Sequence, residues 1–318
     1  MVIIHVVGGF GNQLYCYALY EKLKSLGKEV KLDIGDYLPG AREPEKRELE
    51  LPWLENLEYE TCTPKERFAL TDDSRAFFSR VRRKLLGSKA KIYREPDRYD
   101  PSVFEKDNVY LDGYWNSEAY FADRISSLQK NIKFPVSAEK KNQIYAEKMR
   151  SEESVFMHIR RSDYLDPSCI DRYKGICTEE YYRSALQHIR QIHEKRQAEN
   201  ASVTGEGVGS SPLKIYIFSD DTAYVKEVYK DLDAEVIDWN QGRDSFYDCM
   251  LMSQCKYHIC ANSTFSMWAA RLCTREDKVM VRPLLFDRYQ KITPPEVRKE
   301  WAGWVLMDAE GRIYSEDE

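Results

Sequence analysis

The sequence predicts an α/β protein with one parallel β-sheet in each half of the chain. Short apolar runs recur along the chain and alternate with longer amphipathic stretches, as expected for repeated strand–helix–strand units. The pattern restarts with a new strand near residue 155, after a helical stretch at 142–149. A chain of 318 residues has the length of two ordinary domains. We therefore predict two Rossmann-like domains with a boundary near residues 135–152, assigned as residues 1–150 and 151–318.

The composition is that of a globular protein, with 42% hydrophobic and 32% charged residues. The net charge is −5, so nucleic acid is not an expected partner, and any anionic ligand must be met by local basic residues. No apolar run approaches the roughly 18 residues of a membrane span. The start of the chain does not have the pattern of a signal peptide. The eight cysteines are scattered without a Cys-x-x-Cys pair, which favours reduced thiols in a cytoplasm over a zinc site or disulfides.

The first element is a continuous apolar run, residues 2–7, broken only by His5, which is typical of a buried parallel strand. A glycine turn, a helix at 14–26 and a second strand at 29–34 follow. Within this turn, the backbone at Gly9 and Gly11 can approach a ligand closely, and the helix N-terminus favours negative charge.

The glycine turn does not match the dinucleotide fingerprint, because Leu14 occupies the position of its third glycine. A nicotinamide cofactor is therefore a weaker interpretation. Asn12 and Gln13 instead place two amides at the mouth of the helix, where N-capping and ligand contact are equally open roles.

Residues 40–110 contain few long periodic segments. The stretch 79–94 combines seven basic residues with apolar ones. It could form an interfacial helix on anionic lipid, although a solvated helix face is favoured. A strand at 109–112 then leads into an aromatic loop that suits a sugar face or a core equally well.

The second half begins with a buried strand at 155–158 that runs into Arg160, Arg161 and Asp163. Ligands of parallel sheets bind beyond the carboxyl ends of the strands. Arginine offers a fork of donors that matches a phosphate. Because neighbouring residues of a strand diverge, we expect one arginine to face the ligand and the other to brace the loop, for example against Asp163.

Two further strands of this half also end in polar residues. Asp220 and Asp221 follow the strand at 214–218, after a helix at 179–195 and a predicted loop at 197–212. One aspartate could accept from the N–H edge of guanine while the other caps the next turn, although paired carboxylates also bind metals. The strand at 257–260 leads into a run that can cap a helix and cradle an anion: Asn262, Ser263, Thr264, Phe265 and Ser266.

Three motifs together resemble the α-1,2-fucosyltransferases of glycosyltransferase family 11. They are the glycine turn at 8–13, the His-Ile-Arg-Arg-Ser-Asp-Tyr run at 158–164 and the segment 252–268. The resemblance implies a GT-B-like fold, in which an acceptor-side domain and a GDP-fucose-binding domain face each other across a cleft. It further implies inverting transfer of L-fucose from GDP-β-L-fucose, with no metal or other cofactor. Arg160 would hold the diphosphate, with His158 and Asp220 or Asp221 near guanine.

The family also implies an acceptor, which would be O2 of a terminal galactose in an oligosaccharide or lipid-linked glycan, as in O-antigen or capsule synthesis. It implies a bacterial cytoplasmic enzyme and leaves open a peripheral contact with the inner face of the membrane. Tyr257 and Met267 depart from the His and Trp that relatives often carry. Asp163 is the nearest candidate for the base, and orienting Arg161 is an equally open role. Three other functions stay open: another fucosyl linkage, a nicotinamide oxidoreductase, and a lectin-like module without catalysis.

Overall fold

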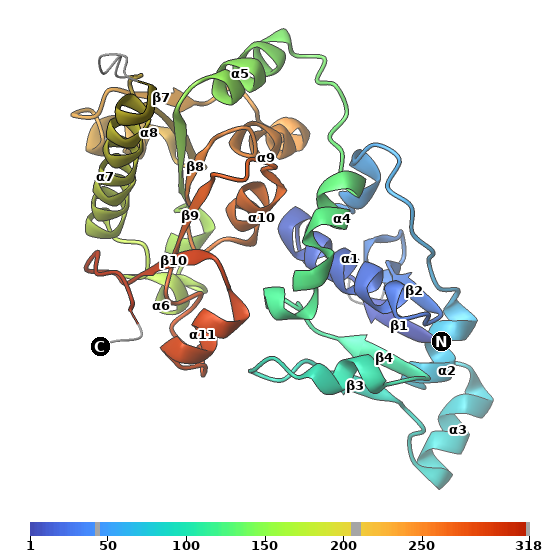
Figure 1. The fold of residues 1–318 in the computed structure, drawn as a ribbon. Helices are drawn as coiled ribbons and strands as arrows, with labels where there is room; N and C mark the ends of the chain where they lie inside the picture. Colours follow the sequence, from blue (N-terminus) through green and yellow to red (C-terminus); the bar gives the residue numbers. More distant parts are fainter. Residues whose placement is uncertain (42–44, 205–210, 316–318) are drawn as a thin grey trace. The chain divides into compact units, whose positions relative to one another are not determined.

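The computed structural model of the chain describes residues 1–41, 45–204 and 211–315. The chain forms two compact units, Met1–Pro135 and Val136–Glu318 (Figure 1). Each unit contains its own parallel sheet with helices packed on it, which confirms the predicted α/β class. Within the described residues, no helix has the length and apolar content of a membrane span.

The boundary between the units follows Pro135, at the early end of the predicted range 135–152 and before the assigned residue 150. Helix α5 (Lys140–Ser151) explains the difference, because its side chains bond to the second unit. The Asn142 side chain accepts a hydrogen bond from Trp239 Nε1 and donates one to Asn240 Oδ1, both at 2.8 Å. Helical periodicity predicts that α5 exists but does not show which sheet it joins.

The sheet of the first unit is built around the apolar run at the start of the chain. Its strand order is β2-β1-β4-β3, with every neighbouring pair parallel. Ile3 and Ile4 are fully buried, as expected for a central strand. The strands are β1 (Val2–His5), β2 (Val30–Asp33), β3 (Ile92–Arg94) and β4 (Val109–Asp112).

The first helix of this unit, α1, begins within the glycine turn and ends just before Gly27, which adopts the left-handed conformation (φ +77°) typical of a C′ glycine. The α-helices are α1 (Phe10–Ser25), α2 (Pro64–Thr71), α3 (Phe77–Leu86) and α4 (Ile125–Asn131). Short 3₁₀ turns lie at 35–37, 51–53, 101–105, 118–120 and 122–124.

The two ambiguous stretches of the first half are now assigned. The aromatic loop belongs to the core, because Trp115, Tyr120 and Phe121 are almost completely buried. The basic stretch at 79–94 is not one helix: α3 ends at Leu86, and residues 92–94 form the edge strand β3.

The second unit has a six-stranded parallel sheet within the described residues, in the order β7-β6-β5-β8-β9-β10. This is the strand order 3-2-1-4-5-6 of dinucleotide-binding folds, in which the connection reverses between the two central strands. Ligands of such sheets bind outside the carboxyl ends of those strands, here β5 and β8. The strands are β5 (Ser154–Ile159), β6 (Lys214–Ser219), β7 (Ala234–Ile237), β8 (Tyr257–Ile259), β9 (Val279–Pro283) and β10 (Trp304–Met307).

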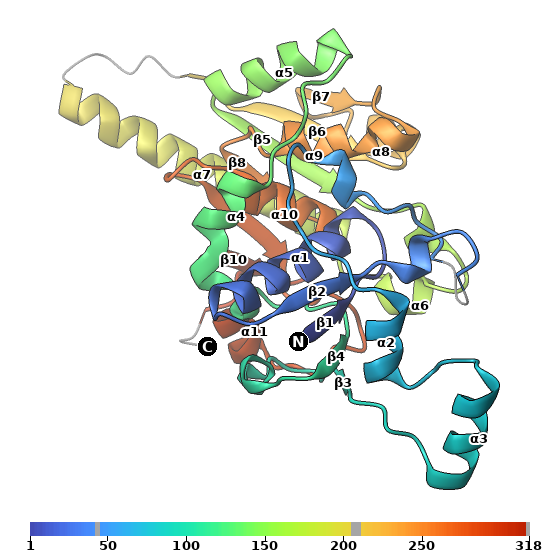
Figure 2. The same ribbon diagram turned by 90° about the vertical axis from the view of Figure 1, so that its right-hand side faces the viewer.

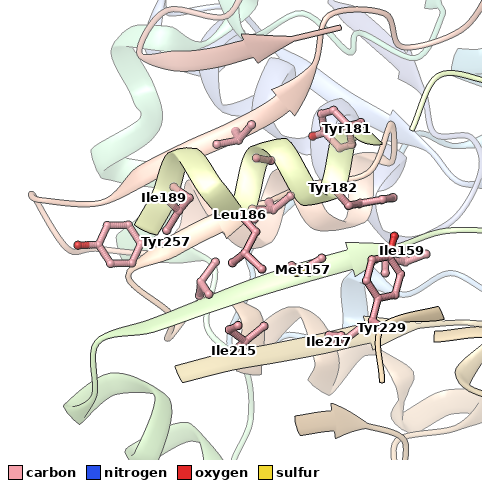
Figure 3. Packing of buried hydrophobic residues seen from close by; sticks show 14 of the residues in the cluster. Met157, Ile159, Tyr181, Tyr182, Leu186, Ile189, Ile215, Ile217, Tyr229 and Tyr257 are labelled. Carbon is pink, nitrogen blue, oxygen red and sulfur yellow. The ribbon is translucent and has the colours of Figure 1, made fainter. Parts of the chain in front are cut away.

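Helices cover both faces of this sheet. On one face, Leu186 and Ile189 of α7 pack against Met157 of β5 and Ile217 of β6 (Figure 3). Helices α9 and α10 lie on the other face (Figure 1). The helices are α5, α6 (Ile170–Tyr173), α7 (Glu179–Thr204), α8 (Thr222–Val228), α9 (Phe246–Met252), α10 (Thr264–Leu272) and α11 (Pro294–Glu300), with 3₁₀ turns at 163–165 and 242–245.

The prediction of a loop at 197–212 is wrong for residues 197–204, because α7 continues to Thr204. Residues 205–210 lie outside the described residues. The helix continues through Gln197, Ala198 and Glu199, which are good helix formers, although Ser202 and Thr204 suggested a loop.

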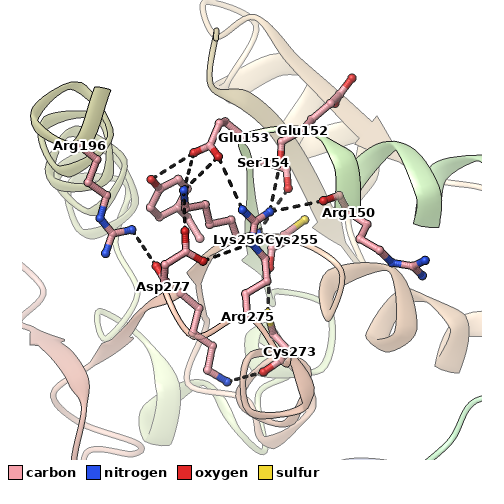
Figure 4. Close-up of polar contacts among 12 residues, drawn as sticks. Arg150, Glu152, Glu153, Ser154, Arg196, Cys255, Lys256, Cys273, Arg275 and Asp277 are labelled. Carbon is pink, nitrogen blue, oxygen red and sulfur yellow. Dashed lines mark hydrogen bonds and ion pairs between the residues drawn. The ribbon is translucent and has the colours of Figure 1, made fainter. Parts of the chain in front are cut away.

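An ion-pair network joins the amino ends of β5, β8 and β9, at the edge of the sheet opposite the predicted site (Figure 4). Lys256 Nζ lies 2.8 Å from a carboxylate oxygen of Glu153 and 2.8 Å from one of Asp277. The Lys256 side chain is only 9% exposed. Burial alone would lower its pKa, but its two carboxylate partners outweigh burial and raise the pKa.

Candidate functional site

The carboxyl ends of β5, β6 and β8 bring three of the four predicted polar groups together in the second unit. The three strands are neighbours, with Ile159 of β5 beside Ser219 of β6 and Met157 beside Ile259 of β8. The arginine pair, the aspartate pair and the run at 262–266 therefore follow adjacent strands at one edge. The fourth group, the glycine turn, belongs to the first unit.

Arg160 is held by two carboxylates. Its Nη2 donates to Asp163 Oδ2 at 2.7 Å, and its Nη1 lies 3.0 Å from Asp220 Oδ2. The side chain is largely buried, and burial alone would lower the pKa of the guanidinium, but Asp163 and Asp220 outweigh this effect and raise it. The charge is therefore permanent and the fork is fixed in orientation at the strand end.

Arg161 points elsewhere, as expected for the neighbouring residue of a strand. Its Nε donates to Asp221 Oδ2 at 3.2 Å, and its guanidinium stacks 3.4 Å from the centre of the Tyr224 ring. Arg161 therefore braces the loop against α8. The predicted partner of the bracing arginine is wrong, however, because Asp163 pairs with Arg160 instead.

The two aspartates after β6 differ in role, as expected. Asp221 is the N-cap of α8 and accepts from Tyr224 N at 3.1 Å. Asp220 accepts from the Arg161 backbone N–H at 2.9 Å and pairs with Arg160. Both carboxylates thus bond to the arginine loop, and a contact with guanine stays a prediction.

The loop after β8 leads into α10, whose N-cap is Ser263. The Ser263 side chain makes no capping hydrogen bond, so the first N–H groups of the helix have neither an intrahelical partner nor this cap. Thr264 begins the helix and Phe265 follows, both partly exposed. Helix N-termini favour anions, and the role of this segment as an anion cradle stays a prediction.

The Asn262 side chain forms hydrogen bonds within the protein, which hold the loop after β8 in place. Its Nδ2 donates to the Phe286 carbonyl at 2.9 Å, and its Oδ1 accepts from Cys177 Sγ at 3.4 Å. The Asn262 carbonyl accepts from Tyr164 Oη at 2.8 Å, which ties the arginine loop to the α10 loop. The predicted ligand contact of the Asn262 side chain is therefore not supported by its position.

His158 lies under α10 and is 6% exposed, with its ring 5.9 Å from that of Phe265. Burial, followed by the positive charge of Arg160, lowers the pKa of His158 to about 3, so the ring is neutral. Its Nδ1 has no hydrogen-bond partner among the described residues. His158 can therefore offer a nucleotide a neutral hydrogen bond, not a charge.

Side chains of neighbouring residues pack closely against the glycine turn of the first unit. Gly8 is left-handed (φ +71°), and a Cβ there would lie 2.4 Å from Asn12 Nδ2. Gly9 is the N-cap of α1 and carries no side chain that could cap. Gly11 is buried, whereas Asn12 is partly exposed and makes no capping bond. Asn12 is thus the amide that stays available for a ligand.

Gln13 is completely buried, and the prediction of a cap or ligand contact is wrong for it. Its Nε2 donates to the carbonyls of Gly8 (2.9 Å) and Glu48 (2.8 Å), and its Oε1 accepts from Glu50 N at 2.7 Å. Gln13 therefore fixes residues 48–51 beside the glycine turn.

Three residues of interest were not singled out from the sequence. Tyr164 lies in the arginine motif and stacks on Tyr173 with ring centres 4.0 Å apart.

His5, at the end of β1, bonds to both Asp112 (3.1 Å) and Asp36 (2.9 Å). A carboxylate only accepts, so two ring N–H donors are needed and the imidazole is cationic. Burial lowers its pKa, but the two carboxylates outweigh this and raise it.

The third residue is Glu50, near Gly9 at the start of α1. Burial raises the pKa of its carboxyl to about 7, although a hydrogen bond with the Phe10 backbone and the charge of Arg47 oppose the shift. No sequence signal pointed to Glu50, because its burial depends on contacts with α1.

Replacing Glu50 with glutamine should make stability less sensitive to pH. The pKa of Glu50 is higher in the folded than in the unfolded state. Its protonated carboxyl therefore stabilises the fold fully at a pH below the unfolded-state pKa, and this stabilisation is lost as the pH rises through about 7. Thermal and urea unfolding should show a gain of up to about 3 kcal/mol for Glu50→Gln over the wild type on going from acid to alkaline pH. The exposed neighbour variant Glu48→Gln is the control, and identical pH profiles for the two variants would contradict the assignment.

The strand order defines a Rossmann-type unit, and Arg160 at the carboxyl end of β5 marks its candidate site. A family model for glycosyl transferase family 11 matches residues 91–305, more than half of the chain. The chain belongs to glycosyltransferase family 11, which decides against the oxidoreductase alternative. Among the described residues, we find no group of three or more His, Cys, Asp or Glu side chains arranged to hold a metal ion.

Curated relatives are similar along most of their length. An α-1,2-colitosyltransferase of Escherichia coli is 24% identical, over 89% of this chain and 91% of the relative. The O-antigen biosynthesis glycosyltransferase WbnK of Escherichia coli is 24% identical, over 87% and 91%. Fucosyltransferase NodZ from Bradyrhizobium, a solved structure, aligns with a TM-score of 0.44 and 15% identity over 85% of this chain and 91% of that one. That likeness is too distant to place any residue.

Proposed function

We propose that this glycosyltransferase moves L-fucose from GDP-β-L-fucose to O2 of a terminal galactose, giving an α-1,2 linkage with inversion. The observation that carries the proposal is the position of Arg160, at the carboxyl end of β5, where the strand order reverses. The start of α10, which the Ser263 side chain does not cap, follows the neighbouring strand β8. The name of the α-1,2-colitosyltransferase relative supports the linkage, and that of WbnK supports an O-antigen glycan as acceptor.

The chemistry requires positive charge at the leaving diphosphate. The bond between the anomeric carbon and the phosphate oxygen breaks, and its electron pair leaves with GDP while the acceptor hydroxyl attacks from the opposite side. A guanidinium has five N–H donors. Asp163 and Asp220 bond to the two terminal nitrogens of Arg160, and further donors of the same group can bind a phosphate. Arg160 and the α10 N–H groups would thus supply the charge stabilisation without a metal.

Asp163 is a positioning residue in this proposal, because its carboxylate holds the Arg160 fork. Its alternative role as the base that takes the acceptor proton stays a prediction. We place the acceptor on the first unit, as a galactose-containing oligosaccharide or a lipid-linked glycan. We also propose a cytoplasmic location, since all eight cysteines are free thiols.

A second candidate is α-1,2-colitosyl transfer, which the name of one relative favours. The two candidates differ in the sugar on the nucleotide and share the site. Transfer assays with each nucleotide sugar, followed by NMR of the product, distinguish them. An α-1,2-linked fucose is the expected product.

Calorimetry with nucleotides tests the proposal directly. GDP and GDP-fucose should bind, while ADP and UDP should bind more weakly by a factor on the order of ten or more, because they lack the guanine edge. Affinities should not change when EDTA removes divalent metals. Binding of GDP that EDTA abolishes, or equal affinity for the three nucleotides, would contradict it. A lectin-like module would bind fucosylated glycan and ignore GDP.

A further inference from the structure

Helix α3 presents an apolar face to solvent, and none of its residues is buried. Phe77, Val81 and Leu85 follow one another at four-residue spacing and form one stripe, with Phe78 beside it. Phe77, Phe78 and Leu85 are 72%, 84% and 75% exposed. In both ribbon views α3 stands away from the sheet of its own unit (Figures 1 and 2). Exposed phenylalanines at this density are unusual on a surface that has no partner.

The opposite side of α3 is fixed to the preceding segment. Arg82 forms an ion pair with the Asp72 carboxylate, and Arg83 donates to the carbonyls of Asp72 (2.6 Å) and Ser74 (2.7 Å). The backbone N–H of Lys89 also donates to Asp72, at 2.8 Å. These bonds hold the helix so that its apolar stripe is directed away from Asp72.

The segment around α3 is strongly basic. Residues 75–91 contain seven Lys and Arg and no acidic residue, in a chain whose net charge is −5. Several of these cations are exposed and have no ion-pair partner among the described residues: Arg75, Arg80, Lys84, Lys89 and Lys91. Positive charge is therefore concentrated beside the apolar stripe.

We propose that α3 binds the surface of an anionic lipid bilayer. Phenylalanine and leucine on one face, with Lys and Arg around them, are the composition of helices that lie in the headgroup region. A second copy of the chain fits less well, because it would bring two such basic segments together. The exposed cations instead match anionic headgroups, each contributing roughly fivefold to affinity. This proposal is independent of the proposed donor and acceptor.

Vesicle co-sedimentation of the full chain tests the proposal. The protein should bind vesicles of phosphatidylglycerol and phosphatidylcholine, less so at high salt, and should not bind pure phosphatidylcholine. Phe77→Ser/Phe78→Ser should lower affinity on the order of 100-fold through lost apolar burial. Arg80→Glu/Lys84→Glu should lower it at least roughly 25-fold. Both variants should keep the wild-type melting temperature and turnover with a water-soluble acceptor, because these residues are exposed and lie outside the donor site.

The matched control is Leu38→Ser/Ile144→Ser, which removes two exposed apolar side chains elsewhere (51% and 64% exposed) and should leave vesicle binding unchanged. Absence of wild-type binding to the anionic vesicles would overturn the proposal, as would equal binding by all variants. A wild-type dimer that Phe77→Ser/Phe78→Ser dissociates, without vesicle binding, would assign the face to a second copy instead.

Discussion

Replacing Arg160 with alanine is expected to lower turnover by roughly 10²–10³-fold, by analogy with the loss of one donor to a developing anion. The guanidinium contact should strengthen as the leaving diphosphate gains charge, so the loss is larger in the transition state than in the bound substrate. Arg160→Lys should not restore activity, because an ammonium lacks the bidentate fork. Steady-state kinetics, GDP affinity and melting temperature are measured for each variant.

Arg161 and Asp163 provide the matched controls. Arg161→Ala removes the ion pair with Asp221 and the stack on Tyr224, so it should lower the melting temperature and retain more turnover per folded molecule. Asp163→Asn leaves an amide oxygen that can still accept from Arg160 and should cost less than Arg160→Ala. A folded Arg160→Ala protein with near-normal turnover would refute the site assignment.

Replacing Lys256 with methionine should destabilise the second unit by about 3 kcal/mol. The methionine keeps most of the apolar length but removes the charge that lies between Glu153 and Asp277, two carboxylates that would then repel each other. Arg275, 3.6 Å from Glu153, offsets part of the loss. The melting temperature should fall by roughly 6–12 °C. Turnover per folded molecule should not change, since the network lies at the edge of the sheet opposite Arg160.

Lys226→Met is the control for Lys256→Met, because Lys226 pairs with Asp238 at 2.6 Å with its side chain 53% exposed. Exposed pairs of this kind contribute about 0.5 kcal/mol or less. Thermal unfolding of both variants therefore separates the effect of burial from that of charge. Equal shifts in melting temperature would show that the network contributes no more than a surface pair.

The sequence predicted most of the fold because central parallel strands are buried on both faces and are therefore continuous apolar runs, such as β1 and β5. It missed β3 and β10, the edge strands at one side of each sheet, which are short and have a single neighbour. The unit boundary was placed late, because the attachment of α5 depends on side-chain bonds to residues far along the chain.

The alternation of strands with polar ends also predicted which residues meet at the site. The pairing among them was not predictable: Asp163 bonds to Arg160 rather than to Arg161, and Asn262 is used within its own loop. Gln13 was misjudged because its partner Glu50 lies 37 residues away, and the Tyr164–Asn262 bond spans 98 residues. Such contacts leave no local periodicity in the sequence.

The long-range pairing of the central strands also affects synthesis of the protein on the ribosome. Strand β1 is made long before its neighbour β4, which begins only at Val109. Strand β5 likewise waits for β8, which begins at Tyr257. At roughly 5–20 residues per second, each apolar strand stays partly unpaired for several seconds or more during translation. These two strands are therefore where the nascent chain most needs a chaperone, and where slower growth at low temperature should improve the yield of folded enzyme.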